Sequence, residues 1–154
     1  IYSEPPRLKQ MIDVYEKYTD PVLGAIHVDD NATKRYGIID PAAEVESGVF
    51  QVKGMVEKPG PEKAPSRIAS IGSYILTPDI FRFLENNKPG HGGEMLLLDA
   101  MAELMKTRPF YARVLDGEYH DTGSKLGYVK ANVEFALRHP EIKKSFKEYL
   151  NTRK

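Results

Sequence analysis

Three expected strand ends in this sequence carry residues that could bind a ligand. Gly37 stands at the first, and Glu57 and Lys58 are adjacent at the second. Asp121 stands on a turn between an expected strand and an expected helix. In α/β proteins, ligands commonly bind at the open ends of the sheet. A glycine lets a ligand approach the backbone, a carboxylate suits sugar hydroxyls, and an ammonium group suits a phosphate.

Asp121 admits two interpretations. Gly123 and Ser124, a residue suited to start a helix, let the carboxylate point away from the core towards a metal ion or a sugar. The alternative is that Asp121 only caps the helix that follows it. The local pattern leaves both interpretations open.

Glu57 and Lys58 end an expected strand in front of a proline-rich loop. Neighbouring side chains of a strand point to opposite faces, so both can contact one ligand only if the chain turns there. Pro59 favours such a turn. The alternative is a solvated Glu–Lys pair at the entrance of a loop.

Other kinds of catalytic site find little support in the sequence. Cysteine is absent, which excludes thiolate chemistry, and no Gly-x-Ser-x-Gly elbow occurs. Residues 90–93 are rich in glycine, but they follow a helix and not a strand, unlike a phosphate-binding loop. No pair of histidines has the spacing of metal ligands; they are His27, His91, His120 and His139.

The composition is that of a globular protein. The chain has 154 residues, of which 41% are hydrophobic and 29% charged, enough for one domain with a core. Lys plus Arg and Asp plus Glu are equal at 22 each, so nothing indicates a nucleic acid or a membrane as partner. The lack of cysteine suits a cytoplasmic setting, and no apolar run is long enough to cross a membrane.

The hydrophobic pattern predicts a mixed α/β fold without internal repeats. The expected strands are 22–28, 36–40, 48–58, 68–76 and 110–115. The expected helices are 5–18, 78–86, 94–106, 124–138 and 141–152. The last helix carries an apolar stripe that can pack on this domain or on a second copy of the chain, and the second arrangement would give a homo-oligomer.

Further motifs extend along nearly the whole chain, among them Val-Glu-Lys-Pro at 56–59 and His-Asp-Thr-Gly at 120–123. In their order and spacing, these motifs resemble the C-terminal half of the bacterial-type UTP–glucose-1-phosphate uridylyltransferases, in the sugar nucleotidyltransferase superfamily. The matching segments are 3–12, 36–40, 52–59, 64–66, 71–78, 92–94, 120–128 and 133–137.

The resemblance implies transfer of a uridylyl group from UTP to glucose 1-phosphate, giving UDP-glucose and pyrophosphate with the help of Mg²⁺. It implies that Asp121 is one of two carboxylates that hold Mg²⁺. Glu57 would bind glucose hydroxyls, and Lys58 would bind the sugar phosphate as the catalytic cation. Gly37 and Gly72 would let the chain approach the sugar. The implied fold is that of the nucleotide-diphospho-sugar transferases, Rossmann-like with a mixed sheet, followed by C-terminal helices.

Two features depart from the family pattern. Leu96 and Leu98 replace a polar pair, which bears on sugar specificity. The family's N-terminal nucleotide-binding part, with its phosphate loop and the second metal carboxylate, has no counterpart in this sequence. We therefore expect residues 1–139 to be the sugar-binding portion of the domain and 140–154 to be a C-terminal helix. We also expect the chain alone to be inactive.

Two alternative functions follow from these departures. The leucine pair favours a related nucleotidyltransferase that uses another sugar phosphate or dTTP. The missing phosphate loop favours a non-catalytic assembly or regulatory module.

Overall fold

The computed structural model describes residues 1–86 and 97–153, and its contacts divide the chain into two compact units. The first, which we call the barrel unit, is Ser3–Asp116. The second, which we call the helical unit, is Ile1–Tyr2 together with the chain from Gly117 onward. Glu57 and Lys58 belong to the barrel unit, whereas Asp121 belongs to the helical unit.

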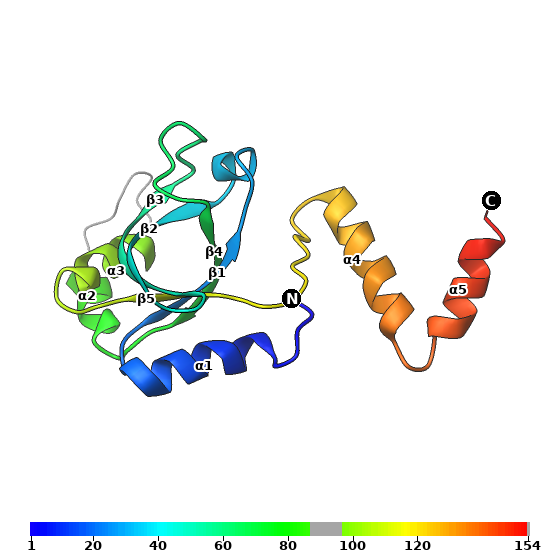
Figure 1. Ribbon diagram of the computed structural model, residues 1–154, viewed down its shortest axis with the longest axis horizontal. Coiled ribbons are helices and arrows are strands. Elements are labelled where there is room, and N and C mark those ends of the chain that lie inside the picture. The colour runs from blue at the N-terminus through cyan, green and yellow to red at the C-terminus, as the bar shows by residue number, and fades with distance from the viewer. Residues whose placement is uncertain (87–96, 154) are drawn as a thin grey trace. The chain divides into compact units, whose positions relative to one another are not determined.

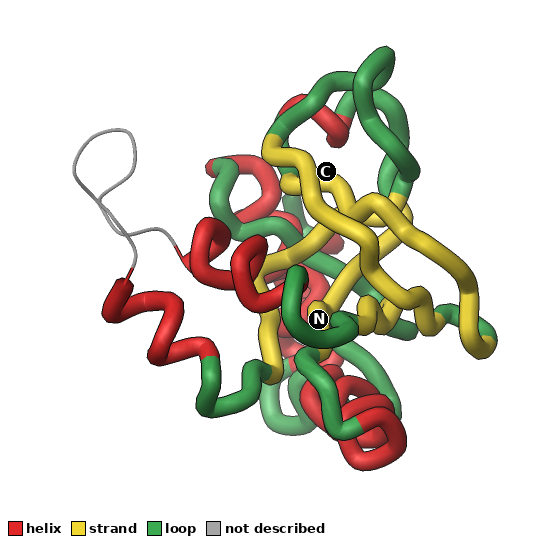
Figure 2. Tube along the Cα trace, turned by 90° about the vertical axis from the view of Figure 1, so that its left-hand side faces the viewer, coloured by secondary structure: helices red, strands yellow, loops and turns green. Residues whose placement is uncertain are grey.

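The strands of the barrel unit close into a barrel (Figures 1 and 2). Around it the order is β1, β4, β2, β3 and β5, and β5 pairs again with β1. β1 and β5 are parallel, and the other pairs are antiparallel. The expected mixed sheet is confirmed, and its closure is an addition to the prediction. The strands are β1 (Val22–His27), β2 (Gly37–Glu46), β3 (Val49–Glu57), β4 (Ile68–Ile75) and β5 (Tyr111–Val114).

Helices pack against different strands of this barrel (Figure 1). α1 (Arg7–Tyr18) contacts β1, β4 and β5, and a short 3-10 turn, η1 (Ala32–Lys34), follows β1. α2 (Ile80–Asn86) and α3 (Leu97–Met105) pack on each other, and α3 also contacts β3. Apolar side chains of the strands and of α2 and α3 form one buried core. Its large members include Leu23, Ile39, Met101, Leu104 and Phe110.

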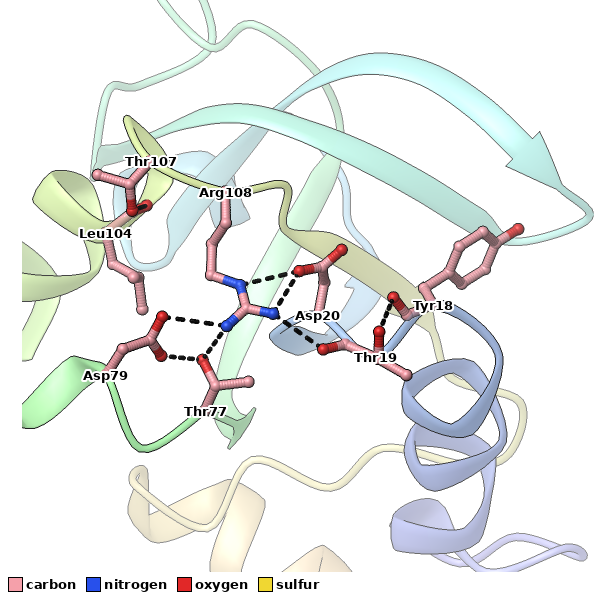
Figure 3. A network of polar contacts seen from close by, with 8 residues as sticks. All are labelled: Tyr18, Thr19, Asp20, Thr77, Asp79, Leu104, Thr107 and Arg108. Atoms are coloured by element: carbon pink, nitrogen blue, oxygen red, sulfur yellow. Dashed lines mark hydrogen bonds and ion pairs between the residues drawn. The ribbon is translucent and has the colours of Figure 1, made fainter.

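Arg108 ties three segments of the barrel unit together (Figure 3). Its guanidinium donates hydrogen bonds to the carboxylates of Asp20 at 2.8 Å and Asp79 at 3.0 Å. It also donates to the Thr77 hydroxyl at 3.0 Å and to the Thr19 carbonyl at 3.0 Å. The Thr77 hydroxyl and then Arg108 hold the pKa of Asp79 below its ordinary value. The segment after α3 is thereby joined to the end of α1 and to the start of α2.

The helical unit contains α4 (Lys125–Arg138) and α5 (Lys143–Asn151). An antiparallel β-bridge joins Tyr2 to Glu118, which precedes α4 in the sequence. The Tyr2 N–H donates to the Glu118 carbonyl at 3.0 Å, and the Glu118 N–H donates to the Tyr2 carbonyl at 2.9 Å. Ala131 is the buried residue of α4, and α5 has no buried residue. Because so little apolar surface is enclosed, this unit depends on contacts near its surface.

Arg138 provides several of those contacts. It donates to the Glu118 carboxylate at 2.5 Å and to the Glu134 carboxylate at 3.2 Å, and it lies 4.6 Å from the centre of the Tyr2 ring. The hydrogen bond from Arg138 holds the pKa of Glu118 below its ordinary value. The end of α4 is thus fastened to the segment that precedes the Asp121 turn.

The expected elements are present with shifted ends. β2 continues through Pro41 to Glu46, whereas the sequence predicts its end at Asp40. Pro41 lies at a register shift between β2 and β3, where a missing N–H is tolerated. The predicted loop at 88–93, the predicted helix start at 94 and Leu96 lie outside the described residues. In the part of the chain that the structure describes, every helix is too short or too polar to cross a bilayer.

Candidate functional site

β3 ends in a carboxylate and an ammonium group that lie side by side. Nζ of Lys58 is 3.1 Å from Oε1 of Glu57, and the two side chains are 58% and 53% exposed. The chain turns directly after Glu57, as contact of both groups with one ligand requires. Exposed ion pairs of this kind contribute little stability, so either group can exchange its partner for a ligand at small cost.

Lys58 holds a backbone conformation that side chains disfavour. Its φ is 46°, in the left-handed region, which costs on the order of 1 kcal/mol for a residue with a Cβ. The Lys58 N–H donates to the Tyr36 carbonyl at 3.2 Å, and the Gly60 N–H donates to the carbonyl of the buried Thr33 at 3.2 Å. These bonds hold the turn in place, and such strain is often found at functional sites.

Gly37 lies directly opposite Glu57 in the pairing of β2 with β3. A Cβ at position 37 would lie 3.0 Å from Oε2 of Glu57 and 3.4 Å from the sulfur of Met55. Glycine here leaves room for the Glu57 carboxylate. The structure therefore brings together three of the predicted site residues, Gly37, Glu57 and Lys58.

The backbone conformation of β4 accounts for the glycine at position 72. Its φ is 68°, and it lies in a two-residue bulge between Ser70 and Ser73, which pair with consecutive residues of β1. Among the described residues, nothing comes within 4 Å of the position that a Gly72 Cβ would take. Neither Glu57 nor Lys58 therefore lies within 4 Å of that Cβ position.

Asp121 forms a turn of its own in front of α4. Its Oδ1 accepts a hydrogen bond from the Gly123 N–H at 2.9 Å, and the residue is half-buried. The cap of α4 is Ser124, whose Oγ accepts the Gly127 N–H at 3.0 Å. The interpretation of Asp121 as the helix cap is therefore wrong.

Gly127 supports this turn, and sequence reasoning missed it. A Cβ at position 127 would lie 1.9 Å from the carbonyl oxygen of Asp121 and 2.8 Å from Oγ of Ser124. Any side chain there would displace the turn or the start of the helix. The available signal is a glycine in the first turn of a helix, where its low helix propensity calls for a packing reason.

The fit of the chain to Mg²⁺ is partial. Mg²⁺ prefers oxygen ligands, and the Asp121 carboxylate can supply one. Within residues 1–86 and 97–153, however, no three His, Asp or Glu side chains gather as a metal site. The described residues therefore offer one ligand group and not a complete set.

A pocket of about 620 Å³ lies between β3 and α3. β3 contributes Glu57 and Met55 to its lining, and α3 contributes Leu98, Met101 and Met105. The sequence predicts a helix here but does not reveal that its methionines border a pocket. The two walls are about 40 residues apart in the sequence, so their contact depends on the tertiary fold.

Comparison with known families gives a clear match. A sequence model of the family described as "Nucleotidyl transferase" matches residues 1–137. The chain belongs to this nucleotidyltransferase family. The predicted superfamily is thereby confirmed.

The proteins similar to this chain include UTP–glucose-1-phosphate uridylyltransferases. A UTP–glucose-1-phosphate uridylyltransferase of Staphylococcus haemolyticus is 46% identical over 143 residues, which are 93% of this chain and 49% of that protein. One of Streptococcus pneumoniae is 41% identical over 145 residues, 94% of this chain and 48% of the relative. The nucleotidyltransferase chain thus spans about half the length of the curated relatives it matches. Which half of them it matches stays a prediction.

Solved structures share its fold. A UDP-glucose pyrophosphorylase complexed with UDP-glucose superposes with a TM-score of 0.80 at 38% identity, over 90% of this chain and 52% of the other. A UTP-bound UGPase from Acinetobacter baumannii gives a TM-score of 0.85 at 35% identity, over 96% and 50%. The expected α/β nucleotide-sugar transferase fold is confirmed.

Proposed function

We propose that this chain carries the sugar-phosphate side of a UTP–glucose-1-phosphate uridylyltransferase site. The complete reaction would give UDP-glucose and pyrophosphate from UTP and glucose 1-phosphate. The observation that carries the proposal is the Glu57–Lys58 pair, 3.1 Å apart on a strained turn at the end of β3. The names of the similar proteins support the choice of substrates.

Each group at the strand end has a role in this proposal. The Glu57 carboxylate accepts hydrogen bonds from glucose hydroxyls, and the Lys58 ammonium group binds the phosphate of the sugar. Gly37 gives the Glu57 carboxylate its place, so its effect on the sugar is indirect. We keep Gly72 as a residue that approaches the sugar, although its positive φ already accounts for the glycine.

The reaction would proceed mainly by positioning of charge. An oxygen of the sugar phosphate attacks the α-phosphorus of UTP, the bond from that phosphorus to the bridging oxygen breaks, and pyrophosphate leaves with the electron pair. Two anions must be brought together for this step. Because the two anions repel each other, the positive charge of Lys58 would lower their repulsion and orient the attacking phosphate.

Asp121 would be a ligand of Mg²⁺ in the complete enzyme. The ion would neutralise charge on the phosphates, and oxygen ligands from outside the described residues would complete its coordination. Asp121 would contribute a carboxylate held by the Gly123 N–H on a turn that Gly127 keeps close to α4.

Titration of the chain with UDP-glucose by isothermal calorimetry tests the proposal. We expect saturable binding that weakens about tenfold or more in Glu57→Gln and in Lys58→Met, because each change removes a charged partner of the ligand. Two changes on the neighbouring exposed loop, Glu62→Gln and Lys63→Met, are matched controls and should leave the affinity unchanged.

Two results would contradict the proposal. One is the absence of any saturable binding, which would favour a non-catalytic module. The other is an unchanged affinity in both Glu57→Gln and Lys58→Met, which would move the sugar phosphate to another part of the chain.

Four wider proposals accompany this function. We retain the cytoplasmic setting and the homo-oligomer as predictions, together with a functional boundary between residues 139 and 140. We also expect the chain alone to bind the sugar nucleotide without turnover, since it spans about half the length of its relatives.

A further inference from the structure

α3 presents an apolar stripe to the pocket that Glu57 borders. Its members recur at the spacing i, i+3, i+4 and i+7, which places them on one face of a helix. They are Leu98, Met101, Ala102 and Met105, and all of them line the pocket. The wall opposite Glu57 is therefore apolar.

The other charged side chains that line this pocket are exposed, as Glu57 is. Lys106 pairs with Glu103 at 2.6 Å, and Lys53 lies 3.5 Å from a carboxylate oxygen of Asp40. Asp99 is exposed in the first turn of α3. These groups border the pocket but do not change the apolar character of the helix face between them.

A pocket with a carboxylate on one wall and aliphatic side chains on the other suits a sugar ring. The hydroxyls of one edge can reach the carboxylate, and the C–H groups of the ring can contact the aliphatic wall. A protein strongly rejects an analogue that lacks a hydroxyl only where a polar group binds that hydroxyl. Leu98 has no such group, and it is half-buried at the pocket.

We propose that Leu98 determines the specificity of the sugar pocket. The pocket accepts glucose 1-phosphate, and it also accepts hexose 1-phosphates that lack the hydroxyl facing Leu98. This inference rests on the proposed function, because it takes Glu57 as the residue that binds the sugar hydroxyls.

Methionine methyl NMR of the chain can locate the sugar directly. Met55 and Met105 line the pocket, whereas Met11 is buried in α1 and does not line it. The chain is titrated with glucose 1-phosphate and with each of its monodeoxy analogues. We expect the methyl signals of Met55 and Met105 to shift while that of Met11 stays in place. At least one analogue should bind within about fivefold of glucose 1-phosphate.

Substitution of Leu98 separates specificity from binding. Leu98→Asn keeps the branched shape and adds hydrogen-bonding groups. It should therefore lower the ratio of the affinity for the accepted analogue to the affinity for glucose 1-phosphate about tenfold. Leu98→Met stays apolar and should leave that ratio unchanged. The Met11 signal reports whether each variant is folded.

Failure of this inference can be told apart from failure of the proposed function. If glucose 1-phosphate binds but the methyl signals of Met55 and Met105 do not shift, Leu98 does not face the sugar. The same conclusion follows if every analogue binds more than about fivefold more weakly than glucose 1-phosphate. It also follows if Leu98→Asn leaves the ratio of the two affinities unchanged. If glucose 1-phosphate does not bind at all, the proposed function itself is wrong.

Discussion

Arg108 in the barrel unit and Arg138 in the helical unit each join two carboxylates. The two arginine side chains are almost equally exposed, at 27% and 26%. Their partners differ, because the carboxylates at Arg108 are 17% and 33% exposed and those at Arg138 are 57% and 44% exposed. Ion pairs contribute more where water is excluded from both partners. The same arrangement should therefore stabilise the barrel unit more than the helical unit.

The apolar interior differs in the same direction. The barrel unit encloses a continuous core from its strands and from α2 and α3. In the helical unit, Ala131 is the buried residue of α4, and α5 has none. The protein thus places the Glu57–Lys58 turn on a rigid support and the Asp121 turn on a weaker one. The following variants test this difference.

The largest effect is expected from the barrel core. Phe110 is fully buried, so Phe110→Ala should lower the free energy of unfolding of the barrel unit by about 3–5 kcal/mol. Phe135 of α4 is 45% exposed, so Phe135→Ala should cost less than about 1 kcal/mol. A denaturant titration, followed by amide hydrogen exchange in each unit, measures the two losses in unfolding free energy. Equal losses would refute the contrast between the two units.

A smaller effect is expected from the arginines. Arg108→Met leaves two partly buried aspartates without their partner and should cost the barrel unit about 1–3 kcal/mol. Arg138→Met acts on exposed glutamates and should cost the helical unit less. Hydrogen exchange of the two units measures the loss in each variant. A larger loss in Arg138→Met would contradict the comparison.

The pH dependence sharpens the same test. The pKa of Asp79 is lowered from 3.8 in the folded protein, so its contribution is complete above about pH 4 and is lost as the pH falls through the lower, folded pKa. The difference in unfolding free energy between wild type and Arg108→Met should therefore shrink on acidification below about pH 4. A difference that grew in that range would contradict the assignment of the network.

The smallest effect is expected from two glycines. Gly72→Ala forces a side chain into a positive φ and should lower the stability of the barrel unit by about 1 kcal/mol. Gly127→Ala should leave the barrel unit unchanged and increase hydrogen exchange at the Asp121 turn, because its Cβ would meet the Asp121 carbonyl. Gly54→Ala is the control, since no described residue lies within 4 Å of that Cβ position and its φ is not positive. A loss at position 54 as large as that at position 72 would refute the role of φ.

Features set by nearby residues could be predicted from the sequence. Ser124 as the start of a helix, the turn at Pro59 and the class of the fold all follow from local patterns. Features that depend on distant contacts could not be predicted in this way. The continuation of β2 through Pro41 requires its pairing with β3, and the pocket at Leu98 requires α3 to lie beside β3. The need for glycine at 127 likewise appears only when the Asp121 carbonyl is in place.

The closure of the barrel by β5 has a consequence for synthesis of the protein on the ribosome. β5 pairs with β1 on one side and with β3 on the other, and it is the last of these strands to be translated. Until it emerges, β1 and β3 each keep an unpaired edge, a state that favours association with other chains. The barrel can close only after translation of Val114, so its folding is bound to a late, long-range step.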